Sequence, residues 1–140
     1  MLRNLWKFSI PHRAARSNHR FIQSDDNCSI FFDFERYPEV LPIRSGSILR
    51  LTLSFSGVVK YQTFSEREQS AEMIRMAGET LVDMGETPWL AEFRSKKAGV
   101  DAAHLRHLMI GFTEDGTYYE FICSGYSIVE EPSPAKEIPW

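Results

Sequence analysis

Two histidines, His104 and His107, are the first side chains whose spacing could serve a metal ion. On a helix, residues three apart share a face, and two imidazoles on one face can bind the same ion. The segment His104–Phe112 instead alternates as a strand does, and an odd spacing on a strand directs two side chains to opposite faces. With no third ligand nearby in the sequence, we predict neither a metal site nor a cofactor.

Several carboxylates occur in close pairs, and such a pair can carry out acid–base catalysis when the two groups have different environments. Asp33 and Glu35 project to one side of an expected strand, and Glu114 and Asp115 stand in an expected turn. Nothing in the flanking sequence desolvates one member of either pair, so we interpret both pairs as solvated acidic surface. Glu120 is flanked by aromatic residues; it is either partly buried or, as we expect, directed to solvent.

The serines and cysteines lack the sequence context of nucleophiles. The chain has no Gly-x-Ser-x-Gly, no phosphate-binding glycine loop and no His-Glu-x-x-His. Cys28 and Cys123 lie in apolar runs without an electropositive setting, which predicts two buried, reduced thiols, with a single disulfide between them as the alternative. We therefore predict no catalytic residues.

The charge of the chain is distributed unevenly. The formal net charge is −3, but residues 1–22 contain five Lys or Arg and no carboxylate. Residues 23–140 therefore carry −8, the net −3 less the +5 of the first segment. Five cations without interleaved aromatic residues are a weak nucleic-acid signal, and no apolar run reaches the length of a membrane span. We predict an acidic body that binds neither nucleic acid nor membrane.

The chain divides into three parts by composition. Residues 1–22 form a basic arm that we predict to be disordered; its composition is also typical of a mitochondrial transit peptide, although Pro11 would interrupt the amphipathic helix of such a peptide. Residues 23–131 are expected to form one domain. Residues 132–140 are rich in proline and predict a loose tail.

Two β-rich stretches surround a helical pair in the expected domain. Ser29–Glu35 and Ser47–Phe55 alternate apolar and polar residues, and Ser56-Gly57 predicts a turn into a returning strand at Val58–Phe64. After the helical segments, Asp115-Gly116 predicts a second hairpin. The residues expected to face the core from these strands are Ile30, Phe32, Phe34, Leu49, Leu51, Leu53, Phe55, Leu108, Ile110 and Phe112.

The helical pair is predicted from its terminal residues. Ser65 and Glu68 have the spacing of a capping box, and an apolar stripe continues from Glu66 to Met84, which predicts one long helix. Thr87-Pro88 predicts the start of a second helix that stops at Gly99. The order β-β-β-α-α-β-β-β indicates an α+β fold, with a mainly antiparallel sheet and the helical pair packed on one face.

An acidic body rich in aromatic residues has the chemistry of a protein-binding face, in which aromatic anchors lie within a charged rim. Such a face attracts a basic partner. The residues that we predict to contact a basic protein partner are Tyr118, Glu120, Glu114, Asp115, Asp33, Glu35 and Tyr37.

The short length, the Ser-Gly hairpin in Leu53-Ser-Phe-Ser-Gly57-Val-Val and the run Gly116-Thr-Tyr-Tyr-Glu-Phe-Ile together resemble small acidic immunity proteins of bacterial polymorphic toxin systems. The resemblance implies a cytoplasmic, non-enzymatic antitoxin that binds and neutralises a basic toxin. Two alternatives stay open. One is a ligand-binding or enzymatic domain with a pocket between sheet and helices, and the other is an organellar accessory protein with a transit peptide.

Overall fold

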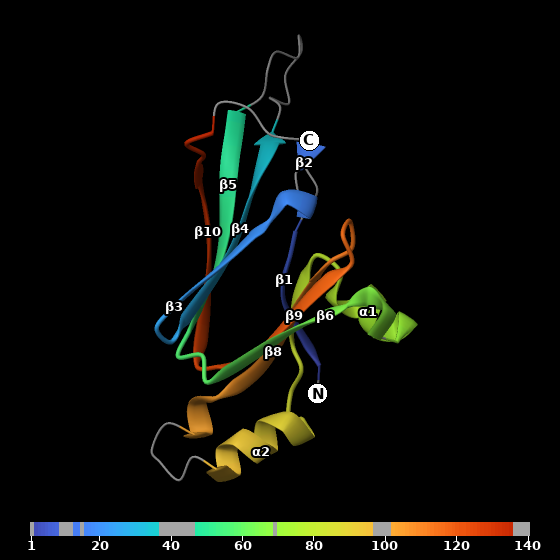
Figure 1. Ribbon diagram of the computed structural model, residues 1–140, viewed down its shortest axis with the longest axis vertical. Helices are drawn as coiled ribbons and strands as arrows, with labels where there is room; N and C mark the ends of the chain where they lie inside the picture. Colours follow the sequence, from blue (N-terminus) through green and yellow to red (C-terminus); the bar gives the residue numbers. More distant parts are fainter. Residues whose placement is uncertain are drawn as a thin grey trace.

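The computed structural model describes residues 2–8, 13–14, 16–36, 47–68, 70–96 and 102–135. Within these residues, ten strands form two five-stranded sheets, and every strand pairs with its neighbours in antiparallel fashion. Two α-helices complete the fold (Figure 1). The predicted α+β class with mainly antiparallel strands is confirmed.

The first sheet contains the strands that lie next to both helices. Its edge strands are β1 and β6, and β8 and β9 form a hairpin inside it. The order across the sheet is β1 (Arg3–Lys7), β7 (Thr80–Asp83), β8 (Arg106–Phe112), β9 (Thr117–Cys123) and β6 (Lys60–Ser65).

The second sheet is built on the two longest strands, β4 and β5, which pair along their whole length. The short strands β2 and β3 both pair with the other edge of β4 and are separated by the 3₁₀ turn η1 (Arg16–Asn18). Its strands are β10 (Gly125–Pro132), β5 (Ser47–Ser56), β4 (Asn27–Arg36), β2 (Arg13–Ala14) and β3 (Arg20–Ser24).

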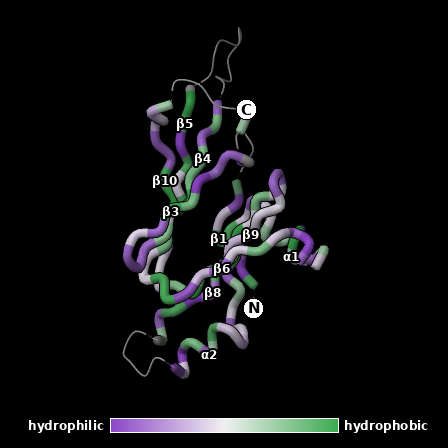
Figure 2. Tube along the Cα trace, in the orientation of Figure 1, coloured by the Kyte–Doolittle hydropathy of each residue, from purple (hydrophilic) through white to green (hydrophobic). Residues whose placement is uncertain are grey.

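The main core lies between the two sheets. Hydrophobic and hydrophilic residues alternate along β4 and β5 (Figure 2), so one face of the second sheet is apolar and packs on the first sheet. The rings of Phe55 and Phe121 stack across the interface with centroids 4.0 Å apart. Each large apolar side chain buried there stabilises the fold by about 1.5–3 kcal/mol. The predicted core residues are buried as expected, apart from the half-buried Leu49: Ile30, Phe32, Phe34, Leu51, Leu53, Phe55, Leu108, Ile110 and Phe112.

Both helices pack on the outer face of the first sheet. Ala77 of α1 (Ala71–Ala77) contacts a cluster with Met109 and Tyr118, and Leu90 of α2 (Pro88–Lys96) contacts a cluster with Ile122. The first sheet is therefore buried on both faces, whereas no described helix covers the outer face of the second sheet (Figure 1). Neither helix is long and apolar enough to span a membrane, as judged from the described residues.

The predicted hairpin between Ser47–Phe55 and Val58–Phe64 is wrong. Gly57, with φ +60°, does turn the chain, but β6 leaves the second sheet and pairs with β9 in the first. Both edges of β5 are occupied by longer partners, β4 and β10. A Ser-Gly turn determines where a strand ends. It does not determine which strand the next segment pairs with. Two sheets consequently replace the single layer that we expected.

The predicted long helix from Glu66 to Met84 is also wrong. The Ser65 amide does donate to Glu68 Oε1 at 3.1 Å, but this contact closes the 3₁₀ turn η2 (Glu66–Glu68). The helix α1 begins later, where the hydroxyl of Ser70 accepts from the Met73 amide. It ends at Gly78, and the chain then enters β7, which is buried between layers. Leu81 and Val82 are buried on opposite faces of this strand, and that burial prevailed over the helical stripe.

The second helix agrees with the prediction at its start. The Thr87 hydroxyl accepts from the Leu90 amide at 3.2 Å, and Pro88 occupies the first helical position. The helix is described as far as Lys96, and the predicted stop at Gly99 lies outside the described residues.

The structure differs from the expected disordered arm over residues 1–22. Strand β1 pairs with β7, in register Arg3 with Asp83, and β3 pairs with β4. Phe8 is 4% exposed and packs edge-on against Phe32 at 5.1 Å between ring centroids. The composition of this segment is basic, but its aromatic residues fill space between the sheets. The basic composition of the segment gave no indication that its aromatic residues pack in the core.

Candidate functional site

The structure separates the residues predicted to form one binding face. Glu114 and Asp115 lie in the turn between β8 and β9, and Asp33 and Glu35 lie on β4 of the second sheet. Tyr37 lies outside the described residues. The remaining two predicted residues, Tyr118 and Glu120, are buried on β9, beneath the helices and next to β6 in the sheet.

Tyr118 is an interior residue with an exposed fraction of 0%. Its ring stacks on Phe64 with centroids 6.0 Å apart, and its hydroxyl is buried with no hydrogen-bond partner among the described residues. Burial, and then the carboxylates of Glu66 and Glu79, raise the pKa of Tyr118. The prediction that Tyr118 contacts a partner directly is therefore corrected. Strand alternation allowed either face, and the packing of α1 made this face interior.

Glu120 belongs to a buried polar chain and does not point to solvent as expected. His107 Nε2 lies 2.8 Å from Glu120 Oε2, and the Gln62 amide donates to the other carboxylate oxygen. His107 Nδ1 lies 2.7 Å from the hydroxyl of Thr87, which also caps α2. The edge of Trp89 covers the imidazole. This hydrogen-bonded chain of a hydroxyl, an imidazole and a carboxylate gives each buried polar group a partner and holds α2 against the first sheet.

Asp33 is engaged by neighbours on the second sheet. Arg50 donates to both of its carboxylate oxygens, at 2.9 and 3.2 Å, and Ser133 donates at 2.7 Å. Partial burial acts to raise the pKa of Asp33, but the hydrogen bonds from Arg50 and Ser133 outweigh it and leave the pKa below its ordinary value. Glu35 is half-buried two residues further along β4. This carboxylate pair is a structural part of the sheet.

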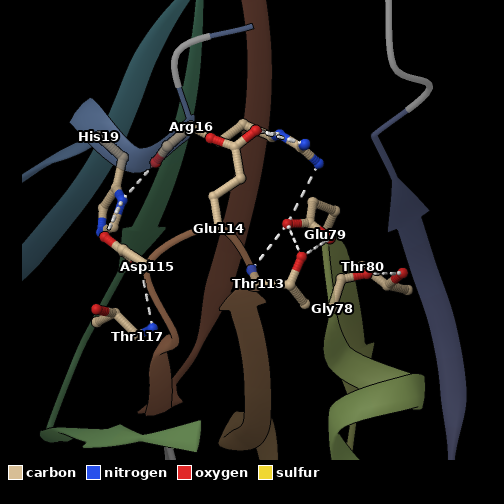
Figure 3. A network of polar contacts seen from close by, with 9 residues as sticks. All are labelled: Arg16, His19, Gly78, Glu79, Thr80, Thr113, Glu114, Asp115 and Thr117. Atoms are coloured by element: carbon tan, nitrogen blue, oxygen red, sulfur yellow. Dashed lines mark hydrogen bonds and ion pairs between the residues drawn. The ribbon is translucent and has the colours of Figure 1, made fainter. Parts of the chain in front are cut away.

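Glu114 and Asp115 lie at an exposed turn that side chains from the first segment of the chain contact. Figure 3 shows Arg16 of η1 reaching over the β8–β9 turn. Its Nη2 donates to Glu114 Oε1 at 2.6 Å, and its Nη1 lies 3.3 Å from Glu79 Oε1. Only 12% of the Arg16 side chain is exposed, so these contacts are better shielded than ordinary surface ion pairs.

Glu79 holds this end of the molecule together in spite of an unfavourable backbone. Its φ is +47°, a conformation that costs a residue other than glycine about 1–3 kcal/mol. Its amide donates to Gly111 at 2.7 Å and its carbonyl accepts from Phe8 at 2.9 Å. Its carboxylate accepts from the amide and the hydroxyl of Thr113, both at 2.8 Å. These contacts offset the strain and fix the turn.

His19 forms the second connection from η1 to the turn. Its ring stacks on Phe112 at 4.2 Å, and its Nδ1 donates to the carbonyl of Arg16 at 2.8 Å, because a carbonyl can only accept. Nε2 lies within hydrogen-bond distance, 2.7 Å, of the Tyr119 hydroxyl oxygen. Asp115 lies 3.5 Å from Nδ1. Burial first, and then Asp115, raises the pKa of Tyr119 to about 12, so the hydroxyl keeps its proton.

A surface hollow of about 490 Å³ opens beside this turn. We call it the acidic hollow, because three carboxylates and one guanidinium line it. The amide of Glu66 donates to the carbonyl of Gly116 at 2.8 Å, which holds η2 against the turn. The lining residues are Ser65, Glu66, Arg67, Ile74, Thr113, Glu114, Asp115 and Gly116. This arrangement can receive a cationic group whose stem packs on Ile74.

The described residues contain no cluster of three or more His, Cys, Asp or Glu side chains that could hold a metal ion. Cys28 and Cys123 are buried and free, as predicted. Burial raises the pKa of both thiols, and that of Cys123 reaches about 12, so neither is a reactive thiolate near neutral pH.

The sequence patterns did not indicate Arg16, His19 or Glu79 as site residues. One signal was present: residues 1–22 carry an excess of positive charge and the rest of the chain an excess of negative charge, which favours ion pairs between the two, such as Arg16 with Glu79. No protein-family model, curated protein or solved structure matches this chain.

Proposed function

We propose that this protein is a non-enzymatic protein-binding module, and that the acidic hollow receives a basic side chain of a protein partner. The observation that carries the proposal is the set of three exposed carboxylates, from Glu66, Glu114 and Asp115, around one hollow. Arg67 also lines the hollow and Arg16 donates to Glu114, so these three carboxylates exceed the two guanidinium groups by one charge. Complementary charge of this kind speeds the encounter with a basic partner and fixes its orientation.

The shape of the hollow favours a long basic side chain. Ile74 provides an apolar surface for the methylene stem of Lys or Arg, and the carboxylates surround the charged end. Arg16 donates to Glu114 and His19 lies 3.5 Å from Asp115, so the turn is already ordered before a partner binds. A preformed site of this kind binds more tightly than one that must be ordered.

Together with the resemblance to immunity proteins, this supports an antitoxin that covers a basic toxin and performs no chemistry of its own. The proposal includes a cytoplasmic setting, where free thiols such as Cys28 and Cys123 are ordinary.

Affinity capture with charge-matched variants tests the proposal. The full chain is used as bait beside the triple variant Glu66→Gln, Glu114→Gln, Asp115→Asn, in which the amides keep the acceptor oxygens of the turn. The control variant Glu92→Gln, Glu130→Gln, Glu131→Gln changes the net charge equally on α2 and β10. We expect wild type and control to retain a basic protein in stoichiometric amounts, and the triple variant to lose it.

The binding constant of a captured partner is then measured at two ionic strengths. Removing three carboxylates from one hollow is expected to weaken binding by roughly tenfold or more, and added salt is expected to weaken the wild-type complex. A partner that binds the triple variant and the wild type equally would show that the acidic hollow is not the binding site.

A further inference from the structure

A second hollow lies at a different place on the first sheet, where α2 approaches the start of β1 (Figure 1). It has a volume of about 560 Å³ and is bordered by α2, by the 3₁₀ turn η3 (Ala102–His104) and by the ends of β1, β7 and β8. We call it the arginine groove. It shares no lining residue with the acidic hollow.

The groove gathers positive charge on a chain whose net charge is negative. Arg3, Arg94 and Arg106 line it together with His104. Two carboxylates, Asp83 and Glu86, oppose them, which leaves an excess of one guanidinium even when the histidine is neutral.

The two carboxylates are already engaged by protein groups. Asp83 Oδ1 accepts from the Gly85 amide at 2.9 Å, and Arg3 and Arg106 share Oδ2 at 3.6 and 3.4 Å. A single carboxylate oxygen at these distances satisfies neither guanidinium fully. Donor capacity therefore remains on both arginines at the edge of the groove.

Arg94 supplies a third, more rigid donor. Its Nη1 donates to Glu86, and this hydrogen bond lowers the pKa of that exposed carboxyl. Its Nη2 donates to the carbonyl of Leu105 at 2.8 Å, and its Nε is buried without a partner among the described residues. Because Nε is buried, a ligand in the groove would meet this guanidinium at its Nη hydrogens.

The remaining wall is apolar. Leu90 and Leu105 are 2% and 4% exposed and lie beneath the groove, and Leu2 lies at its rim with 43% exposed. From the arginines on one side and the leucines on the other, we propose that the groove binds a small organic anion, with a phosphate or carboxylate on the guanidinium groups and an apolar body on the leucines. This inference does not depend on the proposed function.

The test is a titration of the ¹⁵N-labelled full chain followed by amide NMR, with phenyl phosphate, benzoate and inorganic phosphate as probes. We expect phenyl phosphate or benzoate to shift the amide signals of Gly85, Leu90, Arg106 and Ser124 in a saturable way. Whichever of these two probes binds more tightly shows whether the groove prefers a phosphate or a carboxylate. Inorganic phosphate, which lacks the apolar body, is expected to bind at least roughly tenfold more weakly.

Two variants and a control decide whether the arginines carry the binding. Arg106→Gln, at a side chain that is 48% exposed, and Arg94→Lys, which keeps the charge but removes the fork of N–H donors, are each expected to weaken the binding of the better probe roughly tenfold. Lys60→Gln, on β6 outside the groove, is expected to change it less than about twofold. Absence of a saturable shift, or an equal loss in Lys60→Gln and Arg106→Gln, overturns the inference.

Discussion

His19 and His107 have similar contacts in different regions of the molecule. Each ring nitrogen of His107 meets a side chain of the first sheet or its helix, and its carboxylate partner, Glu120, is 13 residues away on the adjacent strand. His19 comes from the turn that interrupts the edge of the second sheet, and its partner Tyr119 is 100 residues away on the first sheet. The cluster of His107 joins a helix to its own sheet, and the cluster of His19 joins the two sheets.

The two clusters stabilise different parts of the molecule. The cluster of His107 fastens α2 to a sheet that is already paired, so its groups are buried and leave little room for solvent. The cluster of His19 and Arg16 holds the two sheets together at one end, where carboxylates remain partly exposed and can meet a partner. Polar groups between a sheet and its own helix stabilise packing. Polar groups between the two sheets can hold the sheets together and also bind.

The largest expected effect comes from breaking the cluster of His107. Glu120→Ala leaves the buried His107 Nε2–H without its acceptor and also removes the acceptor of the exposed Gln62 amide. We expect the free energy of unfolding to fall by about 2–3 kcal/mol, since an unsatisfied buried donor costs about 1–3 kcal/mol and a second hydrogen bond is lost with it. Urea denaturation followed by circular dichroism measures this loss.

Glu120→Gln serves as the matched control because its carbonyl retains one acceptor, and a smaller loss is expected. Equal stability of Glu120→Ala and wild type would contradict the role of the cluster in packing.

A smaller effect is expected from breaking the connection between layers. Arg16→Ala leaves Glu79 and Glu114 without their cation at this end of the molecule. We expect a loss of about 1–2 kcal/mol, because these are charge-assisted hydrogen bonds with partial exposure to solvent. Added salt should reduce the difference between Arg16→Ala and wild type, because it screens the ion pairs that the variant lacks.

Arg16→Lys keeps the charge without the fork of donors, and its stability should lie between the other two proteins. A loss in Arg16→Ala that is the same at low and high salt would mean that packing, and not charge, fastens η1 to the turn.

The smallest effect at neutral pH is expected for Tyr119→Phe, which removes one hydrogen bond to His19 and should cost roughly 0.5–1 kcal/mol. The variant becomes informative in alkali. Folding raises the pKa of Tyr119 from 10.0 to about 12, so this group contributes stability below pH 10 that is lost as the pH rises towards 12.

The wild type should therefore lose stability more steeply than Tyr119→Phe between pH 10 and 12, as followed by denaturation at each pH. Tyr118 and Cys123 also have raised pKa values, but they are common to both proteins and cancel in the comparison. Parallel curves for the two proteins would show that Tyr119 titrates normally in the folded state.

The candidate site could be predicted only in part. Glu114 and Asp115 followed from a turn signal, because Asp-Gly favours the positive φ that Gly116 adopts. Their partners Arg16 and His19 could not be located, because they depend on a contact between segments about 100 residues apart. Tyr118 and Glu120 were placed on the correct strand, but which of its faces met a helix depended on where α1 and α2 packed.

Local sequence patterns specified the strands with clear alternation, the turns with glycine, the start of α2 and the mainly antiparallel α+β class. Each depends on interactions between residues close in the chain, and these leave a periodic record. Long-range contacts placed β6 beside β9, divided the strands into two sheets and brought the basic first segment to one end of them. Those outcomes depend on which distant apolar faces and charges meet, and local spacing carries no information about that choice.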